Sequence, residues 1–133
     1  MAYRFVFERT PHCKQDIFYF HFSNLLTKED ITQLTQKVRE TLEKENSVSM
    51  IHIWDCTDMT QFNLGAKSFL EVILKENNKQ IDSVYLISNK KLIKLAGKIM
   101  SVIINCKLIV LDSIDQMPAH ISDDMSVEMF ATI

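Results

Sequence analysis

One segment of the chain, residues 55–65 (DCTDMTQFNLG), gathers most of the side chains that could do chemistry. It holds two carboxylates, a thiol and two threonine hydroxyls. Asp55 and Asp58 could form a carboxylate pair for acid–base work, but the segment itself contains no histidine or basic residue to complete an acid–base set. Cys56 could be a reactive thiol if the following helix lowered its pKa. A loop acid, a capping acid and a packed cysteine are the simpler interpretation.

Motifs of the common enzyme and cofactor-binding classes are missing from the rest of the chain. The two glycines, Gly65 and Gly97, cannot supply a glycine-rich phosphate-binding loop. No G-x-S-x-G nucleophile motif occurs, and the four histidines lack the spacing of a zinc site. His21 and His52 stand within predicted strands, where a core or sheet-face histidine is the default interpretation. The sequence therefore predicts no enzyme, no cofactor and no metal site.

Composition narrows the class of protein further. The chain has 133 residues, a size that suits one domain, and a net charge of -2, which argues against a nucleic-acid-binding protein. Its three cysteines are odd in number and form no C-x-x-C pair, which predicts a reduced, cytoplasmic protein. The first ten residues, MAYRFVFERT, lack the apolar core of a secretion signal. No apolar run approaches the ~18 residues of a membrane span.

The elements that must position these residues alternate between strands and helices. Period-2 or continuous apolar patterns predict strands over 3–7, 17–22, 48–54, 83–87 and 108–111, and we expect Asp55 to end the third. Helical periodicity predicts helices that begin at Thr27, span 64–77 and follow an Asn89 cap. The order β-β-α-β-α-β-α-β predicts an α/β fold with a mixed, mostly parallel sheet that opens with a hairpin. We expect one domain over 1–133, with a core over 3–111 and a C-terminal extension over 112–133.

Three features along this order are open to more than one interpretation. In the third helix, an inward stripe is expected from Leu92, Leu95, Ala96, Ile99 and Ile103. The same helix carries a basic patch that consists of Lys90, Lys91, Lys94 and Lys98. This patch is either the solvated face of the helix or a binding surface for an acidic partner or an anionic membrane. The methionines near the C-terminus either pack on their own domain or form a dimer contact, and we favour the first.

The segment that follows Asp55 lies where ligands and partners tend to meet α/β sheets. It joins the carboxyl end of a buried strand to a helix N-terminus, which offers free backbone amides. The alternative is an ordinary loop in which Asp55 or Asn63 caps backbone donors. Our candidate partner-binding residues are Asp55, Thr57, Asp58, Thr60, Phe62, Asn63 and Gly65.

This element order and this segment together resemble the STAS family, the fold of anti-sigma-factor antagonists, and its looser SEC14-like relatives. Ile51–Asp55 looks like the family's buried strand that ends in Asp, and residues 60–65 stand where the family has D-S-[ST]-G-L-G, matching at Leu64 and Gly65. The resemblance implies a non-enzymatic protein that binds other proteins. The family's phosphorylated serine falls on Phe62, so Thr57 and Thr60 are the nearby hydroxyls that could carry a phosphate instead.

Two functional hypotheses follow. The first is a STAS-like regulator in bacterial signalling that binds a protein partner or a second copy of itself, with Phe62 as a contact anchor. The second is a carrier of a lipid or another small apolar ligand, as the SEC14-like relatives imply. It requires a pocket between the sheet and the second and third helices, with Lys90, Lys94 and Lys98 near its mouth.

Overall fold

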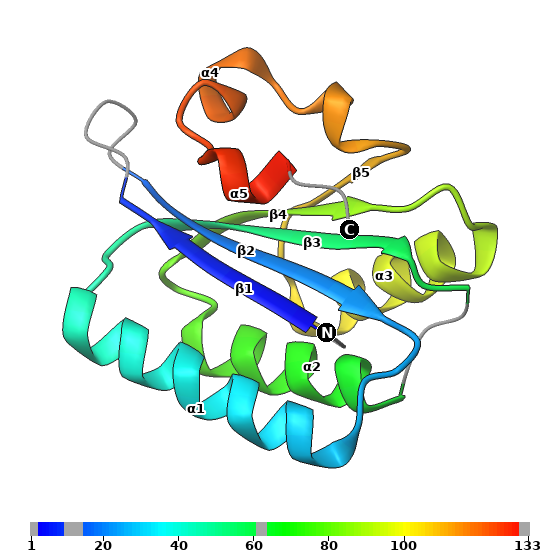
Figure 1. Ribbon diagram of the computed structural model, residues 1–133, viewed down its shortest axis with the longest axis horizontal. Coiled ribbons are helices and arrows are strands. Elements are labelled where there is room, and N and C mark those ends of the chain that lie inside the picture. The colour runs from blue at the N-terminus through cyan, green and yellow to red at the C-terminus, as the bar shows by residue number, and fades with distance from the viewer. Residues whose placement is uncertain (1–2, 10–14, 61–63, 131–133) are drawn as a thin grey trace.

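A five-stranded sheet runs through the middle of the computed structural model, which describes residues 3–9, 15–60 and 64–130 (Figure 1). The strands lie in sequence order: β1 (Tyr3–Glu8), β2 (Asp16–Ser23), β3 (Met50–Asp58), β4 (Ile81–Ile87) and β5 (Leu108–Leu111). β1 pairs with β2 in antiparallel fashion, and all other pairs are parallel. The mixed, mostly parallel sheet and its opening antiparallel pair are therefore confirmed.

Three long helices cover one face of this sheet: α1 (Lys28–Glu45), α2 (Leu64–Asn77) and α3 (Lys91–Ile104) (Figure 1). Each connects one parallel strand to the next in the same direction, and right-handed crossovers then place all of them on the same side. The sheet residues that face these helices are large and apolar; they include Phe18, Phe20, Phe22, Met50, Trp54, Val84 and Leu86.

The C-terminal segment covers the opposite face (Figure 1). It forms a 3-10 turn, η1 (Ile114–Gln116), and two short helices, α4 (Ala119–Ser122) and α5 (Val127–Phe130). Its buried side chains are Met117, Ile121, Met125 and Met129, which pack in one cluster with Tyr19, Ile53, Tyr85 and Ile87 of the sheet. The methionines thus pack on their own domain, as we expected.

Local sequence signals predict the start of α1 and the bounds of α2 correctly. Thr27 caps α1: its hydroxyl accepts from the backbone N–H of Asp30, and the Asp30 carboxylate accepts from the backbone N–H of Thr27, at 3.1 and 2.9 Å. This reciprocal capping box satisfies two backbone donors that the helix leaves unpaired. The expected bounds of α2, 64–77, are confirmed, and its buried side chains are Ala66, Phe69, Leu70, Ile73 and Leu74.

The expectation that the third strand ends at Asp55 is wrong. β3 continues to Asp58, because β2 runs beside it as far as Ser23 and supplies the backbone partners that hold it extended. Asp55, Cys56, Thr57 and Asp58 are therefore strand residues and not part of a loop. A partner strand distant in sequence decides this end, and no local pattern reports it.

The predicted inward stripe of α3 is also wrong. The buried residues are Ile93, Gly97, Met100 and Ile104, whereas the predicted set faces water, apart from Ala96, which is half-buried. α3 is apolar on most of its circumference, so two stripes compete. A Cβ at Gly97 would collide with the Leu86 side chain of β4, so the glycine lets the helix approach the sheet closely on this side.

The start of α3 differs from the prediction as well. Lys90, and not Asn89, occupies the cap position, and it makes no side-chain cap hydrogen bond. The hydroxyl of Ser88 accepts instead from the backbone N–H of Lys90, at 3.1 Å.

Candidate functional site

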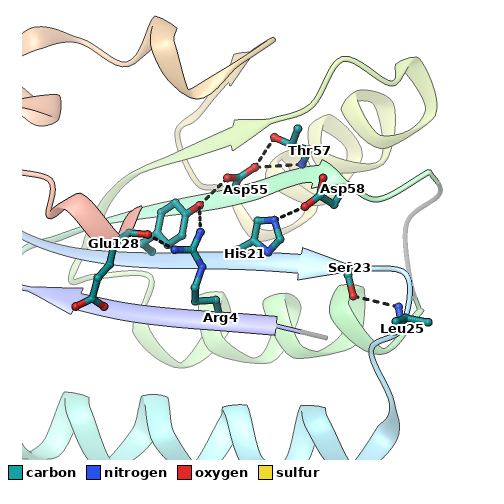
Figure 2. A network of polar contacts seen from close by, with 9 residues as sticks. Arg4, His21, Ser23, Leu25, Asp55, Thr57, Asp58 and Glu128 are labelled. Atoms are coloured by element: carbon teal, nitrogen blue, oxygen red, sulfur yellow. Dashed lines mark hydrogen bonds and ion pairs between the residues drawn. The ribbon is translucent and has the colours of Figure 1, made fainter. Parts of the chain in front are cut away.

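A network of polar side chains lies at the carboxyl ends of β2 and β3, on the sheet face that carries the C-terminal segment (Figure 2). Strand alternation places Tyr19 and His21 of β2 on this face, together with Asp55 and Thr57 of β3. The Arg4 guanidinium joins them from β1. It lies 5.4 Å from the centre of the Tyr19 ring and donates to the backbone carbonyl of Glu128 in α5.

Asp55 is the buried centre of this network. Its Oδ2 accepts from the Tyr19 hydroxyl at 2.6 Å. Its Oδ1 accepts from the backbone N–H of Thr57 at 3.1 Å and from the Thr57 hydroxyl. Both carboxylate oxygens are therefore occupied by donors of the protein itself, and Asp55 ties the end of β3 to β2.

His21 and Asp58 form a second pair beside it. His21 Nε2 lies 2.7 Å from Asp58 Oδ2; the histidine is buried, whereas the Asp58 side chain is 56% exposed. The other ring nitrogen of His21, Nδ1, is buried and has no hydrogen-bond partner among the described residues. The basic neighbour that the sequence did not show near Asp58 thus comes from the adjacent strand.

The chemistry of the neighbouring groups is that of a structural network. Burial, and after it the Asp55 carboxylate, raise the pKa of Tyr19, so its hydroxyl keeps the proton that it donates to Asp55. Burial likewise raises the pKa of the Cys56 thiol, which packs among the helices on the opposite face and stays protonated. Cys56 is the packed cysteine of the simpler interpretation.

The other residues predicted for this site are spread along its outer edge. Thr57, Asp58 and Thr60 are exposed. Asn24 holds Thr60 twice, since its Nδ2 donates to the Thr60 hydroxyl at 3.0 Å and its Oδ1 accepts from the Thr60 backbone at 3.1 Å. Phe62 and Asn63 lie outside the described residues.

Gly65 contributes to a hollow next to this edge. A groove of about 440 Å³ separates the beginnings of α1 and α2, lined by Leu26, Thr27, Lys28, Ile31, Leu64, Gly65 and Ser68. A second hollow of about 430 Å³ runs along α1. Neither of these two contains a residue of α3, where the carrier hypothesis expects the mouth of its pocket.

The sequence interpretation missed Arg4, Tyr19 and His21 as members of this network. The alternation of Tyr19 and His21 with phenylalanines along β2 was the available signal, because it puts both polar side chains on one face. Their meeting with Asp55 and Asp58 depends on the register of two strands more than thirty residues apart. Within the described ranges, no three His, Cys, Asp or Glu side chains gather closely enough to hold a metal ion.

A second candidate surface lies on the outer side of α3. Four large aliphatic side chains are 52–79% exposed there: Leu92, Leu95, Ile99 and Val102. Ile103 lies next to them and is 71% exposed. These five side chains, which we call the α3 row, include four of the five residues that the sequence had placed in the core.

Lysines border the α3 row at its N-terminal half. Lys90, Lys91 and Lys98 are exposed, and Lys94 is half-buried and ion-paired with Asp112. Three of the four lysines predicted to form a basic patch are therefore at the surface, where they border the apolar α3 row. None of the described helices is long and apolar enough to cross a membrane.

Comparison with known proteins identifies the class of fold. No family model matches the sequence, and neither does any curated protein. A solved structure does: an uncharacterised protein of the DUF3478 family from Shewanella loihica, described as having a SpoIIAA-like fold. The TM-score is 0.68 at 17% identity, over 86% of this chain and 89% of that one. This chain has the SpoIIAA-like, STAS-like fold that the sequence resemblance predicts.

Proposed function

We propose that this protein is a non-enzymatic regulatory module that acts by binding another protein, in bacterial signalling and in the cytoplasm. The observation that carries the proposal is the α3 row. Large aliphatic side chains that stand together in water mark a surface that is covered in the working state. The SpoIIAA-like fold supports this interpretation by analogy.

The polar network favours binding over catalysis. An acid–base catalyst must reach a substrate, whereas both oxygens of Asp55 are used within the protein, by Tyr19 and Thr57. The network also holds the end of β3 in place against β2. A fixed strand end that carries the exposed side chains of Thr57 and Asp58 is suited to contact with a partner.

The edge residues Thr57, Asp58 and Thr60 remain our second predicted contact, together with Phe62, Asn63 and Gly65. Phosphorylation of Thr57 or Thr60 would regulate this edge. A phosphate on Thr57 would replace a hydroxyl donor with negative charge beside Asp55, and the repulsion would loosen the end of β3. Carriage of a small apolar ligand is the alternative function.

Native mass spectrometry of the protein, purified gently from its own host, tests the proposal. We expect one protein partner in a fixed ratio, bound by the wild type and by the control Val127→Asp. Val127 is as exposed and apolar as the α3 row but belongs to α5 on the other face. Phe62→Asp and Ile99→Asp then show which surface the partner uses. A bare monomer, or an added mass of a few hundred daltons, would contradict the proposal, and the added mass would favour the carrier.

A further inference from the structure

The spacing of the α3 row is that of a helix-pairing seam. Leu92, Leu95, Ile99 and Val102 are separated by three, four and three residues. These are successive a and d positions of the heptad repeat, at which one helix inserts its side chains between those of another. The buried residues Ile93, Gly97, Met100 and Ile104 form a similar row on the opposite side, which already packs on the sheet. α3 therefore has one seam that is covered and one that is open.

We propose that the open seam docks an amphipathic helix whose edge carries acidic residues. This inference rests on the proposed function and names the chemistry of the partner. The charge pattern points to the acidic edge. In heptad terms Lys91 and Lys98 both occupy g positions, which flank the seam and select the partner by charge. α3 has no acidic residue, and among the described residues neither Lys91 nor Lys98 forms an ion pair. The opposite flank consists of Ala96 and Ile103, which add apolar surface.

A second copy of this chain fits the seam less well. In an antiparallel pair of α3 helices the g positions face each other, so the two Lys98 side chains would meet. In a parallel pair each lysine would face the flank that holds Ala96 and Ile103, where it would gain no ion pair. Either arrangement leaves the lysines without an acidic partner, which disfavours self-pairing and favours a partner of opposite charge.

An anionic membrane also fits less well than an acidic helix. Lysines border only one side of the seam, and Lys94 is neutralised by Asp112, whose side chain is 61% exposed. Three lysines then remain, fewer than the clusters of about four to eight basic residues that mark binding to anionic lipid. The seam also has no aromatic residue to anchor it at a lipid surface.

Titration with two synthetic helices tests the inference. Both carry Leu and Ile at the a and d positions; one has Glu and the other Lys at all e and g positions. Like charges keep each peptide from pairing with itself. We expect the acidic peptide to bind the full-length protein at least about tenfold more tightly than the basic one, because two edge contacts change from attraction to repulsion. Amide shifts in NMR spectra should centre on α3.

Variants assign the binding to the seam. Ile99→Asp should abolish binding of the acidic peptide, whereas Val127→Asp should leave it unchanged. Lys91→Glu combined with Lys98→Glu should reverse the preference in favour of the basic peptide. All of the substituted residues are exposed, and circular dichroism checks that each variant is folded.

Several results would overturn the inference. The first is that the two peptides bind equally well, or that neither binds. The second is a dimer in analytical ultracentrifugation that Ile99→Asp dissociates. The third is binding to phosphatidylserine vesicles that depends on Lys91 and Lys98, while the acidic peptide does not bind. If Ile99→Asp still captures the host partner, the seam is not the docking site but the proposed function stands. If native mass spectrometry of the wild type detects no host partner, the proposed function itself fails, independently of the peptide titration.

Discussion

His52 should make the stability of this protein fall steeply in mild acid. It lies on β3, completely surrounded by core side chains, with ring centroids 5.4 and 5.5 Å from those of Phe18 and Phe20. Neither ring nitrogen has a hydrogen-bond partner among the described residues. Burial lowers the pKa of His52 from 6.5 to about 3, because no neighbouring group compensates the charged form.

The sign and size of the effect follow from proton binding. Below pH 6.5 the unfolded chain takes up a proton at this histidine, and the folded protein does not until the pH nears 3. The free energy of unfolding therefore decreases across this window, by about 1.4 kcal/mol per pH unit. At pH 5.0 the loss relative to pH 7.5 is about 2 kcal/mol, a large share of the ~5–15 kcal/mol that stabilises a typical domain.

His52→Phe isolates this contribution. Urea unfolding of the wild type and the variant at pH 7.5 and 5.0 gives four free energies, and all other titrating groups cancel in the comparison. The wild type should lose about 2 kcal/mol more than the variant on acidification. At pH 7.5 the variant should be more stable by about 1 kcal/mol, since it removes two unpaired polar atoms from the core.

Two controls make the test strict. His120→Gln removes an exposed histidine and should keep the steep pH dependence of the wild type. His52→Leu covers the case in which a phenylalanine ring overpacks the site. If wild type and both His52 variants lose the same free energy between pH 7.5 and 5.0, His52 is not the buried neutral histidine described above, and the reasoning is refuted.

Two further predictions concern the architecture. Asp55→Ala should lower the free energy of unfolding by about 1–3 kcal/mol, because it leaves the Tyr19 hydroxyl and the Thr57 donors without their acceptor. Urea unfolding measures this loss, with Asp82→Ala at an exposed position as the control. Equal stability of the two variants would argue against the network. Gly97→Val should cost about 1–3 kcal/mol, because its side chain collides with Leu86 and forces α3 away from β4. Thermal unfolding measures that loss, and an unchanged midpoint would show that the helix does not need the close approach.

The candidate site was only partly predictable from the sequence. The sequence predicts a site in the segment that begins at Asp55, because the preceding residues form an apolar strand and sites at the carboxyl ends of such strands are a general feature of α/β sheets. The polar contacts of this segment could not be predicted, since Asp55 meets Tyr19 and Asp58 meets His21 across two strands. The role of Asp55 thus changed from a contact residue to a buried anchor.

What the sequence determined by itself is the order of elements and the points where local chemistry starts a helix. Periodicity distinguished strands from helices, and Thr27 with Asp30 marked the start of α1, because these signals act between residues close together in the chain. The alternation of strands and helices then predicted the mixed parallel sheet.

Only the tertiary structure decided which apolar side of α3 faces the sheet and how far β3 extends. Both outcomes depend on the fit between distant parts of the chain. Gly97 lets α3 approach Leu86, which turns Leu95 and Ile99 toward water, and β2 supplies the hydrogen-bond partners that carry β3 to Asp58. A helix with two apolar stripes has no local preference between them, so packing selects the one to bury and leaves the other exposed to water.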